Sequence, residues 1–226
     1  MSGARVVAID GPSASGKSTT AALVASRLGL IHVDTGALYR ALAWVALEEG
    51  TEEPGQVLRG AARVGLSLDP VGGALIVRAG GRSLEEALRT PEVSSGASRV
   101  AGHPELRDWV NSHLRSGVEA AGGGVLDGRD IGTVVFPDAR LKVFLTATPA
   151  ARALRRLKQG GAAIDPERLA AETAALAERD RRDEQRAVAP LRRAEDAVLV
   201  DTTALSLAEQ VERIVALARE RGLPGR

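Results

Sequence analysis

Residues 6–20 read VVAIDGPSASGKSTT, and this stretch decides the fold. Its first four residues are apolar and predict a short buried strand. Residues 11–18 then fit the pattern G-x-x-x-x-G-K-[ST], and apolar residues at helical spacing follow at positions 22, 23, 25 and 28. A strand, a glycine-rich loop and a helix in this order predict a phosphate-binding loop.

The chemistry of such a loop follows from its backbone. Gly11 and Gly16 allow the chain to curl so that successive N–H groups point at one anion, and the following helix adds its positive dipole end. Lys17, which we expect to be exposed in a crevice, adds a full charge for β- and γ-phosphates, and the Ser18 hydroxyl can hold Mg²⁺. A glycine-rich turn that only caps a helix is the alternative. The residues predicted to bind ATP are Gly11, Pro12, Ser13, Ala14, Ser15, Gly16, Lys17, Ser18 and Thr19.

The composition limits the classes of protein to consider. The 226 residues are 44% hydrophobic and 2% aromatic, which predicts one large unit with an aliphatic core. A net charge of +1 gives no overall attraction to nucleic acid or to an anionic membrane. Cysteine is absent, which excludes disulfides and thiolate chemistry. No apolar run is long enough to span a membrane, and Asp10 interrupts the first one too early for a signal peptide, so we expect a cytoplasmic protein.

The remaining chain alternates short apolar runs with helical patterns. Five such runs with helices between them predict a parallel sheet covered on both faces, with strands at 6–9, 30–34, 125–126, 141–145 and 197–200. Between residues 51 and 102 the pattern changes to short alternating runs at 66–68 and 75–77 with glycines between them. This region predicts a small antiparallel insert. Pro91, Pro104, Pro149 and Pro166 are placed to begin helices.

Arginines gather in two later segments. On a 3.6-residue period, Arg179, Arg182, Asp183 and Arg186 fall on one helix face, while Arg181 points away. Such a face is either an anion clamp or a solvated face laced with salt bridges.

The second arginine-rich segment carries Arg152, Arg155 and Arg156 just before Gly160 and Gly161. A mobile segment of this kind beside a nucleotide site predicts a lid that closes over phosphates. An ordinary basic helix end is the alternative.

Polar residues also follow the second and third predicted strands. Asp127 and Asp130 flank Arg129, and one of these carboxylates could position Mg²⁺ or hydrogen-bond to a base, with helix capping as the alternative. Ligands of open α/β sheets bind at the carboxyl ends of strands, so Thr35, Tyr39 and Arg40 should face the same crevice.

Four segments together carry a family resemblance. They are IDGPSASGKST at 9–19, DTGALYR at 34–40, LDGRDIGTVVFPDA at 126–139 and ERDRRDEQRAVAPL at 178–191. With these segments the chain resembles bacterial cytidylate kinases over nearly its full length. The resemblance implies transfer of the γ-phosphoryl of ATP to CMP or dCMP, with Mg²⁺, by a monomer that uses small-molecule nucleotides and no nucleic acid or membrane.

The resemblance also implies an architecture. It is a P-loop kinase core with a five-stranded parallel sheet, formed by 1–34, 122–150 and 187–226. A monophosphate-binding region at 35–121 would contain an insert at 55–96, and a mobile helical lid with its following helix would occupy 151–186.

Roles for individual residues are carried over by matching position. The resemblance places Arg40, Arg129 and Arg186 on the CMP phosphate, and Ser98, Arg107 and Asp130 on cytosine. Arg179 and Asp183 would lie near the sugar and phosphates, and Arg156, together with Arg152, would be the contribution of the lid. The resemblance implies that the catalytic residues are Lys17, Arg129, Arg156, Arg179 and Arg186. It implies that the substrate-binding residues are Thr35, Tyr39, Arg40, Ser98, Arg107, Arg129, Asp130, Arg179, Asp183 and Arg186. The implied metal ligand is Ser18.

Three rival classes are weighed against this interpretation. Another P-loop kinase for adenylate, uridylate or shikimate is the nearest. A GTPase-like switch is disfavoured because the chain's single asparagine, Asn111, is followed by serine and cannot form an Asn-Lys-x-Asp motif. A nucleic-acid-binding protein is disfavoured by the near-neutral charge and scarce aromatic residues.

Overall fold

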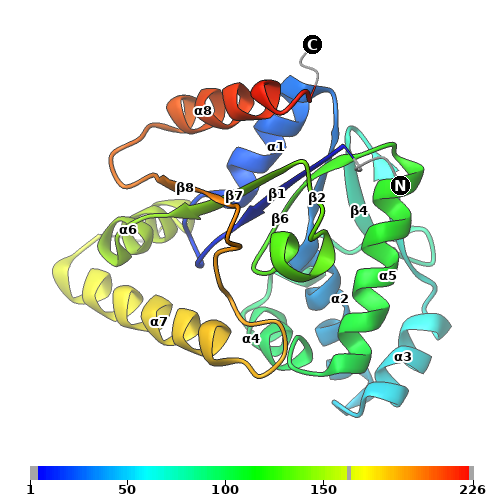
Figure 1. The fold of residues 1–226 in the computed structure, drawn as a ribbon. Helices are drawn as coiled ribbons and strands as arrows, with labels where there is room; N and C mark the ends of the chain where they lie inside the picture. Colours follow the sequence, from blue (N-terminus) through cyan, green and yellow to red (C-terminus); the bar gives the residue numbers. More distant parts are fainter. Residues whose placement is uncertain (1–4, 162–163, 224–226) are drawn as a thin grey trace.

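The computed structural model describes residues 5–161 and 164–223. Its centre is the predicted parallel sheet of five strands (Figure 1). Their order across the sheet, which the sequence did not predict, is β2-β6-β1-β7-β8. The strands are β1 (Val6–Asp10), β2 (Ile31–Asp34), β6 (Gly124–Gly128), β7 (Leu141–Thr146) and β8 (Val198–Asp201). Asp10 pairs in register with Gly128, and Asp34 with Asp127, so the carboxyl ends of β1, β2 and β6 meet at one edge of the sheet.

The insert is antiparallel, as predicted, but it is also part of the main sheet. β3 (Leu66–Val71), β4 (Ala74–Ala79) and β5 (Arg82–Ser83) pair antiparallel with one another. β4 also pairs parallel to β2, which extends the sheet to eight strands. The sequence predicted a separate insert because the alternation of side chains along a strand does not tell which neighbour the strand will pair with.

Both faces of the sheet are covered by helices. Along β1, Val7 and Ile9 face α1 (Lys17–Leu28) and α8 (Leu207–Glu220), whereas Val6 and Ala8 belong to the core on the opposite face. That second face is covered by α2 (Thr35–Glu49), α4 (Pro91–Val100) and α5 (Pro104–Ala120) (Figure 1). The buried cores are almost entirely aliphatic, as the composition predicted.

Glycine and proline mark the ends of several helices. Gly29 and Gly50 end α1 and α2 in the left-handed conformation, which glycine adopts without steric strain. Proline begins α3 (Pro54–Arg63), as it does α4 and α5. The short helix η1 (Ala87–Arg89) connects the insert to α4.

Two helices project from the carboxyl edge of the sheet. α6 (Pro149–Gln159) and α7 (Pro166–Gln185) lie side by side beyond β7 and β8 (Figure 1). α6 ends where Gly160 and Gly161 were expected to break it. These helices form most of the segment predicted to be the lid.

One element was not predicted. Ile131–Val135 forms a single π-helical turn, η2, directly after β6. Asp10 explains it, because the two oxygens of its carboxylate accept hydrogen bonds from the backbone N–H groups of Ile131 and Gly132, each at 2.8 Å. The turn therefore depends on a partner far away in sequence.

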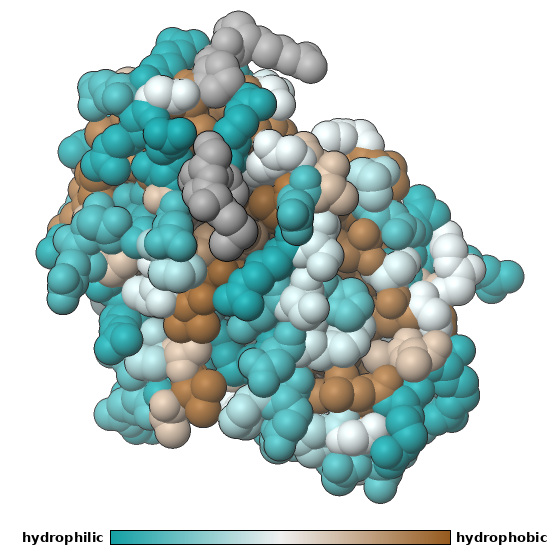
Figure 2. Space-filling model, turned by 45° about the vertical axis from the view of Figure 1, so that its right-hand side comes forward, coloured by the Kyte–Doolittle hydropathy of each residue, from teal (hydrophilic) through white to brown (hydrophobic). Residues whose placement is uncertain are grey.

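On the face shown in Figure 2, hydrophilic residues surround small, separate apolar patches. None of the helices in the described ranges combines the length and the apolar character needed to cross a membrane.

Candidate active site

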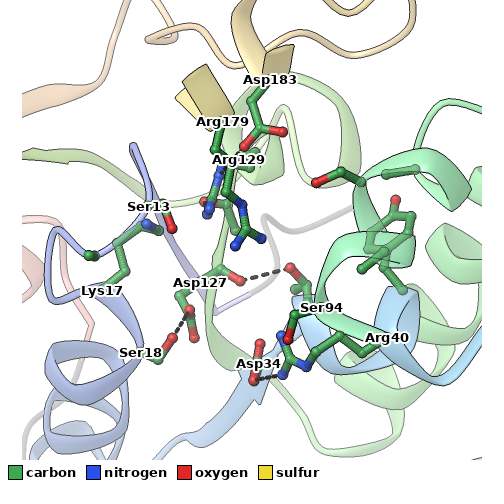
Figure 3. Close-up of a pocket in the computed structure, with 18 of the residues that line it drawn as sticks. Ser13, Lys17, Ser18, Asp34, Arg40, Ser94, Asp127, Arg129, Arg179 and Asp183 are labelled. Atoms are coloured by element: carbon green, nitrogen blue, oxygen red, sulfur yellow. Dashed lines mark hydrogen bonds and ion pairs between the residues drawn. The ribbon is translucent and has the colours of Figure 1, made fainter. Parts of the chain in front are cut away.

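A cleft of about 540 Å³ opens at the carboxyl edge of the sheet. In Figure 3, Lys17 and Ser18 lie on one side of it, Arg40 and Ser94 on the other, and Arg129 and Arg179 between them. Every predicted substrate-binding residue lines this cleft, as does Arg156. The lining residues are Ser13, Ala14, Gly16, Lys17, Ser18, Thr19, Asp34, Thr35, Gly36, Tyr39, Arg40, Leu88, Arg89, Ser94, Ala97, Ser98, Ala101, Arg107, Asp127, Gly128, Arg129, Asp130, Arg155, Arg156, Gln159, Arg179, Asp183 and Arg186.

The phosphate loop curls because of two glycines and one strained alanine. Gly11 has φ +148°, and a Cβ added there would lie 2.0 Å from the carbonyl oxygen of Leu145 on β7. Gly16 has φ +93°. Ala14 adopts φ +58°, a left-handed conformation that costs an L-residue roughly 1–2 kcal/mol and that the sequence did not predict.

Part of the predicted ATP-binding loop does not face the cleft. Gly11, Pro12 and Ser15 are buried behind it and are absent from the lining. Their place is structural, since the Pro12 carbonyl and the Ser15 hydroxyl both accept hydrogen bonds from the Lys17 ammonium, at 2.6 and 3.3 Å.

Lys17 is not exposed, contrary to the prediction. Only 5% of its surface is accessible, and its ammonium folds back against the loop. Burial lowers its pKa well below the usual value, and the nearby Arg129 adds to this shift. The error arose because the sequence identifies the loop but not which way the side chain turns, and here the ammonium donates to the Pro12 carbonyl and the Ser15 hydroxyl.

Asp127 connects the phosphate loop to β2. One carboxylate oxygen accepts a hydrogen bond from the Ser18 hydroxyl at 2.5 Å, and the other lies 2.9 Å from Nε2 of His32. Its backbone carbonyl accepts from the Thr35 hydroxyl at 2.7 Å. A hydroxyl and a carboxylate oxygen side by side at the end of a phosphate loop are the ligands that Mg²⁺ takes in P-loop proteins.

Asp130 has a different partner, although it is only three residues further along. Its carboxylate forms a buried ion pair with Arg107, whose guanidinium also lies 5.4 Å from the centre of the Tyr39 ring. Burial raises the pKa of Asp130, while Arg107 works in the opposite direction. The two aspartates flanking Arg129 thus serve opposite sides of the cleft.

Arginines from several elements converge between these two sides. Nε of Arg129 donates to Asp183 on α7 at 2.9 Å, and Arg40 donates to Asp34 at 2.6 Å. Burial beside Arg129 lowers the pKa of Arg179 to about 10, and its Nε is buried without a hydrogen-bond partner. A buried guanidinium with an unused donor is prepared to receive an anion.

Two arginines expected on one face of the helix that follows Pro166 are placed differently by the structure. Arg182 does not line the cleft; it is exposed and pairs with Glu178 on the solvent side of α7. α7 ends at Gln185, so Arg186 does not lie on the helix face and reaches the cleft from the bend that follows the helix. Its guanidinium donates hydrogen bonds to the carbonyls of Val188 and Ala189, which stabilise this bend.

Arg152 is likewise not a residue of the cleft. It is buried and donates to the carbonyls of Ser13 and Ala147 at 3.0 and 3.1 Å. Arg155 and Arg156 do line the cleft. Arg155 also donates a hydrogen bond to the Thr202 hydroxyl, and Arg156 forms an ion pair with Glu172. The arginines of α6 are therefore divided between structure and site.

Some lining residues were missed. Asp34, Arg89 and Ser94 face the cleft but were not predicted to belong to it. Asp34 ends a strand as Asp127 does, and that position was a usable signal. Arg89 and Ser94 lie on η1 and α4, after the strands of the insert, and no local pattern marks them.

Positive charge dominates the cleft. Its arginines outnumber its carboxylates. The arginines are Arg40, Arg89, Arg107, Arg129, Arg155, Arg156, Arg179 and Arg186. The carboxylates are those of Asp34, Asp127, Asp130 and Asp183. An anion-binding cleft with a phosphate loop on one side and arginines from distant elements on the other defines a P-loop phosphotransferase.

Comparison with known proteins gives the family. The family model for cytidylate kinase matches residues 7–220, and the chain belongs to this family. It is 45% identical to the cytidylate kinase of Stutzerimonas stutzeri (strain A1501), covering 97% of each chain, and 46% identical to that of Pseudomonas aeruginosa (strain LESB58), covering 96% of each. It also matches 42% of the length of the bifunctional pantoate ligase/cytidylate kinase of Synechococcus sp. (strain JA-2-3B'a(2-13)), at 44% identity.

Proposed function

We propose that the protein transfers the γ-phosphoryl group of ATP to CMP or dCMP, giving ADP and CDP or dCDP. Membership of the cytidylate kinase family supports this activity. The observation that carries it is the shared cleft, in which a phosphate loop faces arginines and a buried Asp130–Arg107 pair. The reaction needs two nucleotides in line and dispersed positive charge, and no covalent nucleophile.

The donor phosphates would bind to the loop. The backbone N–H groups after Ser13, together with the dipole of α1, would hold the β-phosphate. Lys17 would leave the Pro12 carbonyl and pair with the β- and γ-phosphates, since an anion is a stronger partner for an ammonium than a neutral carbonyl.

The acceptor would bind opposite. Arg40, Arg129 and Arg186 would hold the CMP phosphate, with Asp183 fixing Arg129 in place. Asp130 would accept from the cytosine amino group while Arg107 and Ser98 donate to ring acceptors, which matches the edge that cytosine presents. Thr35 and Tyr39 would complete the walls of this side.

Mg²⁺ would bind between the two sides, at Ser18 and Asp127. The adjacency of their oxygens fits this ion, which favours oxygen ligands and would supply positive charge that neutralises the donor phosphates. Arg156 and Arg179 would add charge around the transferring group, and α6 and α7 would act as the lid that excludes water.

The division of the chain is part of the same proposal. Segments 1–34, 122–150 and 187–226 form the core, 35–121 the monophosphate-binding region, and 151–186 the lid. We also propose that the protein acts as a monomer in the cytoplasm and does not use nucleic acid.

A panel of acceptors with ATP tests the function. CMP and dCMP should be phosphorylated at least about a hundredfold more efficiently than UMP or AMP, because a site built to pair polar groups rejects a base that leaves them unpaired. Equal use of AMP, or no phosphorylation of CMP, would overturn the proposal. Activity lost on removal of Mg²⁺ and restored by its return would support the metal site.

A further inference from the structure

Two buried charged residues outside the cleft hold one residue of the phosphate loop by both of its backbone polar groups. The N–H of Ser13 donates to Asp180 on α7 at 3.0 Å, and the carbonyl of Ser13 accepts from Arg152 on α6 at 3.0 Å. Arg152 and Asp180 are themselves an ion pair at 2.5 Å. Both polar groups of a single residue are thus held by a charge pair formed between the two helices of the predicted lid.

The Arg152–Asp180 pair and the residue it holds are buried and connected by several hydrogen bonds, which restricts their movement. Ser13, Arg152 and Asp180 are each no more than 7% exposed. Arg152 is fixed further by its bond to the carbonyl of Ala147, just after β7. Buried, charge-assisted hydrogen bonds are among the stronger polar interactions in proteins, and breaking one leaves a charge without a partner.

The position of the pair explains a strained residue. Ala14 follows Ser13 directly and adopts φ +58°, which an L-residue occupies only when its surroundings enforce it. The N–H of Ser13 is committed to Asp180, so the curl that offers N–H groups to phosphate begins at Ala14. The orientation of Ser13 therefore sets the start of the anion cradle.

We propose that Asp180 and Arg152 are positioning residues for the donor nucleotide: by holding Ser13 they keep Ala14 in its left-handed conformation and the loop ready to bind phosphate. Neither residue lines the cleft, so they act through the loop and not by contact with ATP. The inference rests on the proposed function only in taking this loop as the ATP site.

The test measures binding of Mg²⁺–ADP and of CMP separately by calorimetry. Asp180→Asn keeps an acceptor for Ser13 but loses the charge that pairs with Arg152. The dissociation constant for ADP should rise about tenfold, because fewer molecules hold the binding-competent loop, while that for CMP changes less than twofold. Glu178→Gln, an exposed acid on the same helix, is the matched control and should change neither.

A second substitution tests the strained residue. Adding Ala14→Gly to Asp180→Asn should restore most of the ADP affinity, since glycine adopts positive φ without strain. If Asp180→Asn does not fold, Asp180→Asn with Arg152→Gln replaces it, because that pair of changes leaves no unpaired buried charge.

The outcomes separate the two proposals. Unchanged ADP affinity, an equal loss for ADP and CMP, or no recovery with Ala14→Gly would each overturn the positioning role. Failure of the wild type to bind CMP in preference to UMP would instead overturn the proposed function, whatever the variants do with ADP.

Discussion

At the scale of single residues, the two carboxylates that flank Arg129 divide the cleft. Asp127 faces Ser18 and the phosphate loop, whereas Asp130 is paired with Arg107 beneath Tyr39. The divergence arises because β6 ends at Gly128 and the chain then bends into η2, which turns the two side chains toward different neighbours.

The first prediction concerns Asp130. Asp130→Asn should raise the KM for CMP about tenfold and the KM for ATP less than twofold, because it removes the charge from one charge-assisted hydrogen bond on the acceptor side. Steady-state kinetics with each substrate varied in turn would measure this. An equal rise in both KM values would place Asp130 at the metal instead.

Asp130→Asn is preferred to Asp130→Ala for a structural reason. Arg107 is only 2% exposed; alanine would remove the acceptor of its ion pair altogether, whereas asparagine keeps a side-chain oxygen that can accept from the guanidinium. Such a loss destabilises a protein by about 3–5 kcal/mol and would confuse binding with folding.

The second prediction concerns Asp10. Burial raises its pKa from 3.8 to about 6, although its bonds to Gly132 and Ile131 oppose the shift. A carboxyl whose pKa is higher in the folded state stabilises that state most at low pH, and this stabilisation is lost as the pH rises through the folded pKa. Relative to Asp10→Asn, the wild type should therefore gain about 1 kcal/mol in unfolding free energy from pH 7 to pH 5.

Urea unfolding of both proteins at the two pH values would measure this difference. If the difference in unfolding free energy between wild type and variant did not change with pH, Asp10 would have its ordinary pKa in the folded state.

At the scale of elements, the phosphate loop is set by its junction with β7 as much as by its own residues. Gly11 lies so close to the Leu145 carbonyl that no side chain fits, and Ser13 is held by α6 and α7. The conformation of the loop therefore depends on the assembly of β1, β7, α6 and α7 around it.

The third prediction compares two glycines with positive φ. Gly50 follows the last residue of α2, and a Cβ added there would have no atom within 4 Å. Gly50→Ala should therefore destabilise the fold only by the strain of positive φ, about 1 kcal/mol, and leave turnover unchanged. Gly11→Ala, with a contact at 2.0 Å, should destabilise it by more than about 3 kcal/mol and abolish turnover. Thermal unfolding and kinetics of both variants would test this, and equal destabilisation would mean that β7 yields to the side chain.

At the scale of the whole molecule, the cleft exists because the sheet brings together residues far apart in sequence. Arg40, Arg107, Arg129 and Arg179 come from different elements and share one cavity. Arginines outnumber carboxylates in this cleft, and an excess of like charge disfavours the folded state, so an anion that binds there should stabilise it.

The fourth prediction follows from that charge. CMP at about a hundred times its dissociation constant should raise the unfolding free energy by about 2.7 kcal/mol, which corresponds to roughly 5–10 °C in Tm for a chain of this size. Thermal unfolding with CMP, and with UMP as the matched control at the same concentration, would measure it. A similar shift with both nucleotides would show that the phosphate alone is recognised.

Much of the fold was predictable because its signals are local. Proline at the start of a helix and short apolar runs between helices each act within a few residues, and the predicted prolines begin α4, α5, α6 and α7. The pairing of β4 with β2 was not predictable, since a strand carries no mark of its neighbour across the sheet.

The site was predictable only in part. Residues in specific motifs, such as Arg129, Asp130 and Asp183, were expected in the cleft and line it. Helical periodicity grouped Arg182 with Arg179 and Asp183, but Arg182 is exposed and pairs with Glu178, as the alternative of a solvated face predicts; periodicity gives the angle around a helix but not what each side chain faces.

The sequence by itself determined the phosphate loop, the order of strands and helices, and the family, because these depend on residues adjacent along the chain. Only the tertiary structure decided that Lys17 turns inward, that Asp127 and Asp130 separate, and that Arg152 holds the loop instead of lining the cleft. Each of these depends on a partner distant in sequence, or on competition among partners, and such contacts exist only once the chain is folded.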